Sequence, residues 1–364
     1  MSVALLYEPI YLIVVVLLTF MAMGQYSQKA IENQVRRNTS QSEIAFILAI
    51  AFSLAIGLRP QSKVFVDMMN YVQMYNVNRG EVFTFDWGLD NKIYDNLFLF
   101  WASNDIGITS FFLLIAFVYF MGIFIASKKM FPKDTLLAYV MYLGAFSTFS
   151  YSVNGAKAGA AAALFLVALA YRERAMVSIL IALLSYGAHH SMQVVVVAYI
   201  LTFFFKNPKH YLYGWLVCFM MGLLHITFFQ EFFGGLTDEQ GAGYLLNDSP
   251  DEISGFRIDF ILYSALPIFL GYRIINKYKI QSKFYIQIIN LYTLTNSVWL
   301  LCLYGTSINR IAYLSWLMYP FVLLYPFVNL VWSNRQMGYL KYVVYGHLGF
   351  TLFMQFIYYG FIHG

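Results

Sequence analysis

Apolar runs close to the length of a membrane crossing recur along the whole chain, separated by short polar or basic segments. A helix needs about 20 apolar residues to cross the hydrocarbon core of a bilayer. The runs do not alternate as the strands of a membrane β-barrel do. The pattern predicts an all-α polytopic membrane protein with a single integral membrane domain over residues 1–364. About twelve transmembrane helices are expected, at residues 4–23, 44–58, 107–126, 135–150, 153–171, 175–189, 191–205, 211–229, 257–275, 284–303, 311–332 and 341–359.

Composition supports the membrane assignment. The chain has 364 residues, of which 60% are hydrophobic and 11% are charged, whereas about 25% of the residues of a soluble domain are charged. This composition excludes an ordinary soluble domain. Only two cysteines occur, Cys218 and Cys302, and both lie in apolar runs, which argues against a disulfide framework or a zinc site.

The basic residues predict an orientation. If both termini lie outside, 16 of the 23 basic residues fall in inner loops, as the positive-inside rule requires. The other seven fall on the outer side, and they are Arg59, Lys63, Arg79, Lys92, Lys157, Arg257 and Arg310. Since insertion preference does not explain these cations, they are candidates for binding an anionic lipid headgroup. The alternative is that each pairs with an acidic residue on the outer side.

Two long segments are expected outside. Residues 59–106 contain two amphipathic stretches, 64–76 and 90–101, which are typical of interfacial helices lying against a membrane. Residues 230–256 are rich in glycine and acidic residues. This second segment is either a lid over an outer cavity or a plain connector.

The stretch 151–193 predicts a helical hairpin that carries candidate chemistry. It brings Lys157 and the pair His189 and His190 to the same face of the bilayer. A cation about one turn inside an apolar helix is costly and is a functional candidate, although its ammonium could also extend to the headgroups. A histidine is suited to removing a proton from a hydroxyl near neutral pH. The alternative is a histidine at the membrane interface that bonds a carbonyl.

The first half of the chain resembles a known family. Gly57-Leu58-Arg59-Pro60, followed by Asp67 and Tyr71, is similar to the GxR…D…Y segment of the EpsG-type, Wzy-like polymerases of O-antigen, capsule or exopolysaccharide. Asp67 and Tyr71 are four residues apart and so share one helix face.

The later motifs extend this resemblance to about residues 44–325. Lys157, followed by His189 and Ser191, resembles the basic residue of a small-residue helix and the H-x-S motif of that family. Arg310 in Asn-Arg-Ile-Ala-Tyr is similar to its late R-xx-Y element. The family usually carries arginine where this chain has Lys157, and lysine lacks the bidentate grip of arginine on phosphate.

The resemblance implies a GT-C-like helical glycosyltransferase in a bacterial inner membrane, with its site facing the periplasm. The activity implied is polymerisation of oligosaccharide repeat units linked to undecaprenyl diphosphate, which serve as donor and acceptor. Other partners implied are membrane lipid, a chain-length regulator and a flippase, with no nucleic acid. No metal and no cofactor is implied, because protein cations can stabilise the departing pyrophosphate.

These positions give a set of candidate site residues. The residues expected to bind the pyrophosphate are Arg59, Lys157, Arg257 and Arg310. The preferred catalytic base is His189, with His190 or Asp67 as substitutes. The expected sugar contacts are Tyr71, Trp87 and Tyr244, although Trp87 could instead be a membrane anchor.

Other functions stay open at this point. A flippase or transporter of the same lipid-linked sugars would carry its charges near the bilayer midplane, whereas the unusual charges here lie at one surface. An O-antigen ligase uses the same donor as a polymerase, so the sequence does not separate the two. A membrane acyltransferase and a non-catalytic scaffold are further alternatives.

Overall fold

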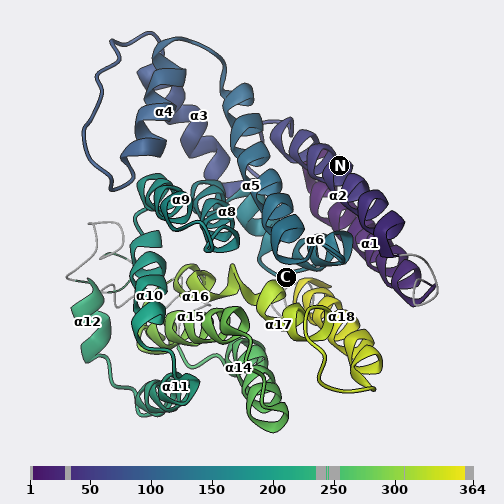
Figure 1. Cartoon of the computed structure of the whole chain (residues 1–364). Helices are drawn as coiled ribbons and strands as arrows, with labels where there is room; N and C mark the ends of the chain where they lie inside the picture. Colours follow the sequence, from purple (N-terminus) through teal and green to yellow (C-terminus); the bar gives the residue numbers. More distant parts are fainter. Residues whose placement is uncertain are drawn as a thin grey trace. The chain divides into compact units, whose positions relative to one another are not determined.

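The computed structural model of the protein (Figure 1) describes residues 3–28, 34–234, 243, 245, 255–306 and 308–356. Within these residues every regular element is a helix, as the apolar pattern predicted. The chain divides into two compact units. Unit 1 comprises Met1–Met192, Phe327–Asn329 and Arg335–Gly364, and unit 2 comprises Gln193–Pro326 and Leu330–Asn334.

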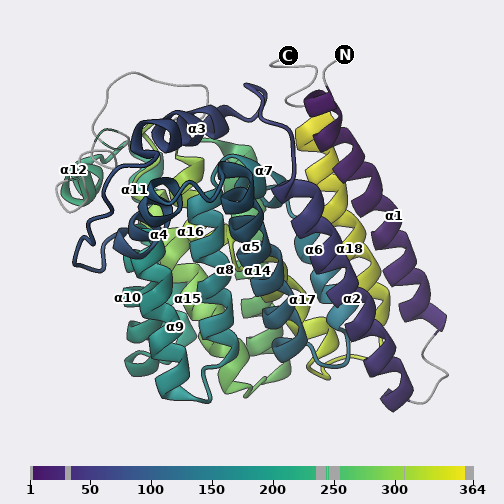
Figure 2. The ribbon, with the colours of Figure 1, turned by 90° about the horizontal axis from the view of Figure 1, so that it is seen from above.

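Unit 1 holds the first half of the chain and the last helix. Its elements are η1 (Val3–Leu6), α1 (Tyr7–Gln28), α2 (Gln34–Gly57), α3 (Val66–Asn78), α4 (Lys92–Ser103), α5 (Ile108–Met130), α6 (Thr135–Leu143), α7 (Thr148–Val153), α8 (Ala156–Ala170), α9 (Ala175–Ala188) and α18 (Gln336–Leu352). Helix α5 packs between α2 and α8, and α8 also packs on α9. Helix α18 lies beside α1 (Figure 2).

Helices α8 and α9 form the antiparallel hairpin that the sequence predicted. Ser178, near the start of α9, donates a 2.8 Å hydrogen bond to the carbonyl of Ala168 near the end of α8. Ser185, near the end of α9, donates a 2.6 Å bond to the carbonyl of Ala161. Both helices are rich in small residues, which lets their backbones approach closely. Lys157 and His189 therefore lie at the same end of the hairpin.

One of the expected spans is wrong as a single helix. Residues 135–150 divide into α6 and α7, and Thr148 caps the break by donating a 2.7 Å hydrogen bond to the carbonyl of Tyr142. Residues 311–332 contain α16 and α17, which are separated only by Leu317 and Met318, and Asn309–Val328 as a whole is one candidate span. Pro320 lies in the first turn of α17, where its missing N–H breaks no helical hydrogen bond. Within 135–150, by contrast, the apolar run continues while the helix stops at Leu143.

Unit 2 is built around a helix that is buried along most of its length. Its helices are α10 (Met192–Phe204), α11 (Pro208–Leu223), α12 (Phe228–Gly234), α14 (Ile258–Tyr278), α15 (Lys283–Leu300), α16 (Asn309–Trp316) and α17 (Tyr319–Val328). Helix α15 packs against α11, α14 and α16. Its buried Asn296 accepts from the indole of Trp215 at 2.7 Å and donates to Ser315 at 3.0 Å.

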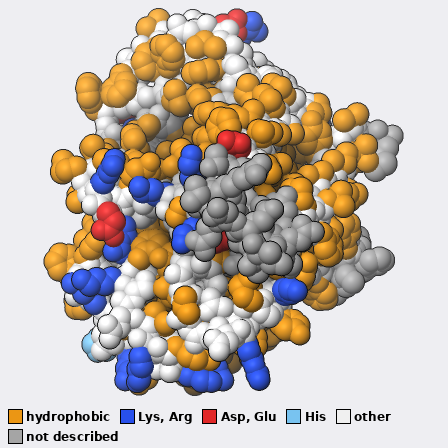
Figure 3. All heavy atoms as spheres, turned by 45° about the vertical axis from the view of Figure 1, so that its right-hand side comes forward, with side chains coloured by type: hydrophobic (Ala, Val, Ile, Leu, Met, Phe, Trp, Pro, Cys, Tyr) orange, Lys and Arg blue, Asp and Glu red, His pale blue; other side chains and the backbone are white. Residues whose placement is uncertain are grey.

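The surface is that of a membrane protein. Ile13 and Leu17 on α1 are 58% and 63% exposed, and hydrophobic side chains cover much of the surface visible in Figure 3. Exposed apolar surface on this scale is typical of contact with lipid. Among the described residues, length and composition single out four candidate spans, Val3–Gly24, Ile108–Met130, Ile258–Tyr278 and Asn309–Val328, and shorter apolar helices accompany them.

Candidate functional site

Lys157 lies in the first turn of α8 and faces a carboxylate from α4. Its ammonium is 2.8 Å from the Asp95 carboxylate, and the side chains of Lys157 and Asp95 are 19% and 44% exposed. The ammonium also lies over the ring of Tyr94, 5.0 Å from its centroid. The cation is therefore partly desolvated and paired, but the pair remains open to a ligand on the side of Asp95.

Asn91, the residue before α4, binds His190. Asn91 has φ 61°, directly before α4 begins. Its amide oxygen accepts the backbone N–H of His190 at 2.9 Å. The carbonyl of Asn91 accepts the backbone N–H of Asp95 at 3.0 Å, which ties Asn91 to the first turn of α4. Asn91 and the first turn of α4 thus contact both His190 and Lys157 at one end of the hairpin.

A glycine in α9 allows this close approach. A Cβ atom built on Gly187 would collide with the side chain of Ile93 on α4 and would lie 3.2 Å from the backbone oxygen of Leu89. The absence of a side chain at this position lets α4 pack directly on the end of α9, where the histidines follow.

The Nδ1 atoms of His189 and His190 both lie near hydrogen-bond donors. The rings of His189 and His190 stack, with centroids 5.0 Å apart. The Nδ1 atom of His189 accepts the backbone N–H of Ser191 at 3.2 Å, and that of His190 lies 3.4 Å from the amide nitrogen of Asn91. A neutral imidazole carries one proton. With Nδ1 accepting, that proton lies on Nε2, so neutral His189 and His190 present a donor there rather than a base.

Arg59 is buried at the end of α2. Its side chain is only 3% exposed, and its guanidinium donates to the carbonyls of Ile56 at 2.7 Å and Val153 at 2.9 Å. Burial lowers the pKa of Arg59 to about 10, so the group stays charged at neutral pH. Val153 is the last residue of α7, just before the turn that leads to Lys157. Arg59 therefore anchors this turn instead of facing solvent.

Tyr71 on α3 connects the surroundings of Arg59 and Lys157. Its ring centroid is 6.3 Å from that of Tyr94, which lies under Lys157. It is 6.4 Å from the ring of Phe112, over which the Arg59 guanidinium lies at 5.2 Å. Aromatic rings thus fill the space between the two cations, and Tyr71 is half-buried among them.

A comparison with protein families gives a match over most of the chain. The model of the EpsG family matches residues 44–362. The chain belongs to the EpsG family. This is a family of Wzy-like polysaccharide polymerases, which act as glycosyltransferase-type enzymes in the membrane. No curated protein and no solved structure matches the chain.

The other predicted residues of this EpsG-family chain lie outside the cluster around α4. Asp67 is half-buried in the first turn of α3, and Trp87 is 85% exposed with its ring 4.7 Å from that of Phe85. Tyr244 lies outside the described residues. The expected lid is described only at residues 230–234, 243, 245, 255 and 256. The structure thus leaves the roles of Asp67, Trp87 and Tyr244 as predictions.

Arg257 and Arg310 belong to unit 2. Arg257 makes a bidentate ion pair with Asp259, with its two bonds at 2.6 and 3.0 Å. Arg310 lies exposed in the first turn of α16. The acidic partners that the sequence offered as an alternative are present for Arg79, Lys92, Lys157 and Arg257. An acidic partner therefore does not distinguish Lys157 from the other three cations. What distinguishes it is the set of residues around it, on α4 and at the end of α9.

Sequence reasoning missed Asn91 and Asp95. Both lie in the amphipathic stretch 90–101, which was expected to be a helix. The sequence signal that could have identified them was their spacing of four residues within a helix expected at the outer face. No acidic or histidine cluster of three or more that could hold a metal ion occurs within the described residues.

Proposed function

We propose that the protein polymerises lipid-linked oligosaccharide repeat units at the outer face of a bacterial inner membrane. The growing glycan, carried on undecaprenyl diphosphate, is transferred to a sugar hydroxyl of an incoming lipid-linked unit. The observation that carries this proposal is the cluster on α4, where Asp95 and Asn91 hold Lys157 and His190 at one end of the hairpin. The EpsG family supplies the class of reaction.

Lys157 is the proposed ligand of the diphosphate. Its ion pair with Asp95 is open to solvent on the side of Asp95, whose side chain is 44% exposed, so a ligand can approach the pair from that side. A diphosphate carries more charge than one carboxylate and can displace it. The donors at Nε2 of His189 and His190 would add hydrogen bonds to the phosphate oxygens. Donors aimed at the charge that develops on a leaving group are a large source of catalysis and need no metal.

Asp95 is the proposed base once Lys157 has exchanged partners. The acceptor hydroxyl gives its proton to the Asp95 carboxylate while its oxygen forms the new glycosidic bond. The bond between the donor sugar and the diphosphate breaks, and the diphosphate leaves on its lipid. This assignment replaces His189 as the preferred base, because the hydrogen bonds at Nδ1 favour a protonated Nε2 in the neutral ring.

A test of this function uses a deletion strain complemented with variants of residue 157. Its extracted glycan is separated on a gel. We expect single repeat units in the deletion strain, a ladder with wild type, and a loss of about 100-fold or more in long chains with Lys157→Ala. The matched control is Lys129→Ala, because Lys129 also lies over a tyrosine ring, at 5.2 Å from Tyr171, but at the other end of the hairpin.

Two outcomes would contradict the proposal. Loss of all surface glycan in the deletion strain, including single units, would indicate a ligase or a flippase. A normal ladder from a Lys157→Ala variant present in the membrane at the wild-type level would remove Lys157 from the site.

A further inference from the structure

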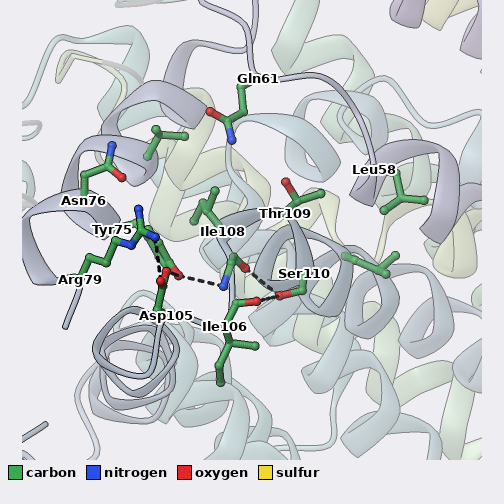
Figure 4. A pocket seen from close by; sticks show the side chains of 13 residues that line it. Leu58, Gln61, Tyr75, Asn76, Arg79, Asp105, Ile106, Ile108, Thr109 and Ser110 are labelled. Atoms are coloured by element: carbon green, nitrogen blue, oxygen red, sulfur yellow. Dashed lines mark hydrogen bonds and ion pairs between the residues drawn. The ribbon is translucent and has the colours of Figure 1, made fainter.

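A groove of about 630 Å³ lies between α3 and the start of α5 (Figure 4). Its polar lining includes the amides of Gln61 and Asn76 and the hydroxyl of Thr109, which surround the same space in Figure 4. Leu58 and Val72 contribute apolar surface. A groove of this size suits a small ligand, and none of the residues discussed above in the cluster on α4 lines it.

The charges in the groove balance each other. The guanidinium of Arg79 is 2.7 Å from the carboxylate of Asp105, and these side chains are 58% and 48% exposed. Tyr75 donates a further hydrogen bond to Asp105 at 3.2 Å and accepts the backbone N–H of Gly107 at 2.8 Å. The hydrogen bond from Arg79 lowers the pKa of Asp105. The pair is therefore ionised and neutral as a whole, which gives an anionic ligand no net attraction.

The lining also disfavours a hydrocarbon tail. A lipid tail in the groove would remove water from the Arg79–Asp105 pair and from the amides without replacing their hydrogen bonds, which is costly. A sugar replaces that water with its own hydroxyls. Amide, carboxylate and guanidinium groups supply both donors and acceptors. The apolar carbons of Leu58 and Val72 can meet the C–H face of a sugar ring.

Helix α3 is shared by the groove and the surroundings of Lys157. Tyr71 packs towards Tyr94 under the lysine, while the next residue, Val72, lines the groove. A second hollow of about 420 Å³ shares Val72 and Asn76 with the groove. Helix α3 therefore contributes neighbouring residues both to the surroundings of Lys157 and to the groove.

We propose that this groove is a saccharide subsite that holds neutral sugars of the lipid-linked substrate beside the reacting centre. The inference rests on the proposed function, and it names Gln61, Asn76 and the Arg79–Asp105 pair as sugar-binding groups. A subsite of this kind holds the glycan between successive transfers. It therefore increases the number of units added before the chain dissociates.

The test compares Asn76→Ala with Asn70→Ala. Both asparagines are exposed on α3, but Asn70 lines neither hollow. The probe is a lipid-free oligosaccharide released by mild acid from the polymer that the wild-type strain makes. Its binding to the full-length purified protein is measured by calorimetry. We expect about fivefold weaker binding for Asn76→Ala, as for loss of one hydrogen bond, a larger loss for the Gln61→Ala, Asn76→Ala double variant, and wild-type binding for Asn70→Ala.

Chain length is the second measurement. In the complemented deletion strain, Asn76→Ala should shorten the ladder while single units are still consumed, and Asn70→Ala should leave the ladder unchanged. Equal oligosaccharide binding by the two variants would overturn the subsite. Displacement of the oligosaccharide by molecules that carry dodecyl chains would also overturn the subsite, because it would show that the groove binds lipid. An intact ladder from Lys157→Ala would contradict the proposed function rather than the subsite. The binding measurement would still test whether the groove holds the oligosaccharide.

Discussion

The ion pair between Lys157 and Asp95 allows a decisive substitution. Asp95→Asn keeps the shape of the side chain but removes its negative charge. If Asp95 is the base, the rate of transfer by purified protein should fall by about 10²- to 10⁴-fold. Affinity for a short prenyl diphosphate should not fall, and should rise by up to about fivefold, because the competing ion pair is gone. Single-turnover transfer and equilibrium binding separate the two effects.

Asp86→Asn is the control for this substitution. Asp86 also pairs with a lysine of α4, Lys92, in an exposed ion pair, so its loss tests whether any weakened contact of α4 lowers activity. A purely structural role of Asp95 predicts that both variants lose activity together. It also predicts weaker binding of the diphosphate to Asp95→Asn, opposite to the gain expected here.

Arg59 shows how burial changes the interpretation of a motif residue. An arginine at the outer end of a predicted span suggested a phosphate ligand. Its guanidinium bonds the carbonyls of Ile56 and Val153 and so holds the turn before Lys157, while its role as a phosphate ligand stays a prediction. A charged group contributes to a site through position as well as contact, and only the packing around it distinguishes the two roles.

At the scale of the element, the site depends on how closely α4 approaches α9. A valine at position 187 would collide with Ile93, so Gly187→Val should push α4 away and separate Asn91 from His190 and Asp95 from Lys157. We expect loss of the glycan ladder although every charged residue is retained. The control is Gly214→Val, because nothing lies within 4 Å of a Cβ atom at Gly214. An intact ladder from a membrane-resident Gly187→Val protein would contradict the role of this contact.

The elements that the sequence predicted best are those fixed by local pattern. The hairpin of α8 and α9 follows from two apolar runs and a short turn, and α3 and α4 fall on the two amphipathic stretches in 59–106. The break between α6 and α7 was missed, because hydrophobicity continues through it. The partnership of Asp95 with Lys157 was missed because it joins residues 62 positions apart.

At the scale of the whole molecule, the proposal requires one end of the α8–α9 hairpin to face outward. Trp87 lies in the expected outer segment and is 85% exposed, whereas Glu173 lies in the turn between α8 and α9 with its side chain 82% exposed. Because the side chains at these two positions are similarly exposed, a membrane-impermeant thiol reagent distinguishes them only by the side of the membrane on which each one lies. With Cys218 and Cys302 replaced by alanine, the reagent applied to intact cells stripped of their outer layers should label Trp87→Cys and not Glu173→Cys.

Inverted membrane vesicles supply the converse measurement, because they expose the inner face. There the reagent should label Glu173→Cys and not Trp87→Cys. Most basic residues then lie inside, in agreement with the positive-inside rule, and Lys157 is a cation retained on the outer side by its function. Labelling of Glu173→Cys from outside would show that the chain has the opposite orientation in the membrane. The site would then face the cytoplasm, and polymerisation of units already carried across the membrane could not occur there.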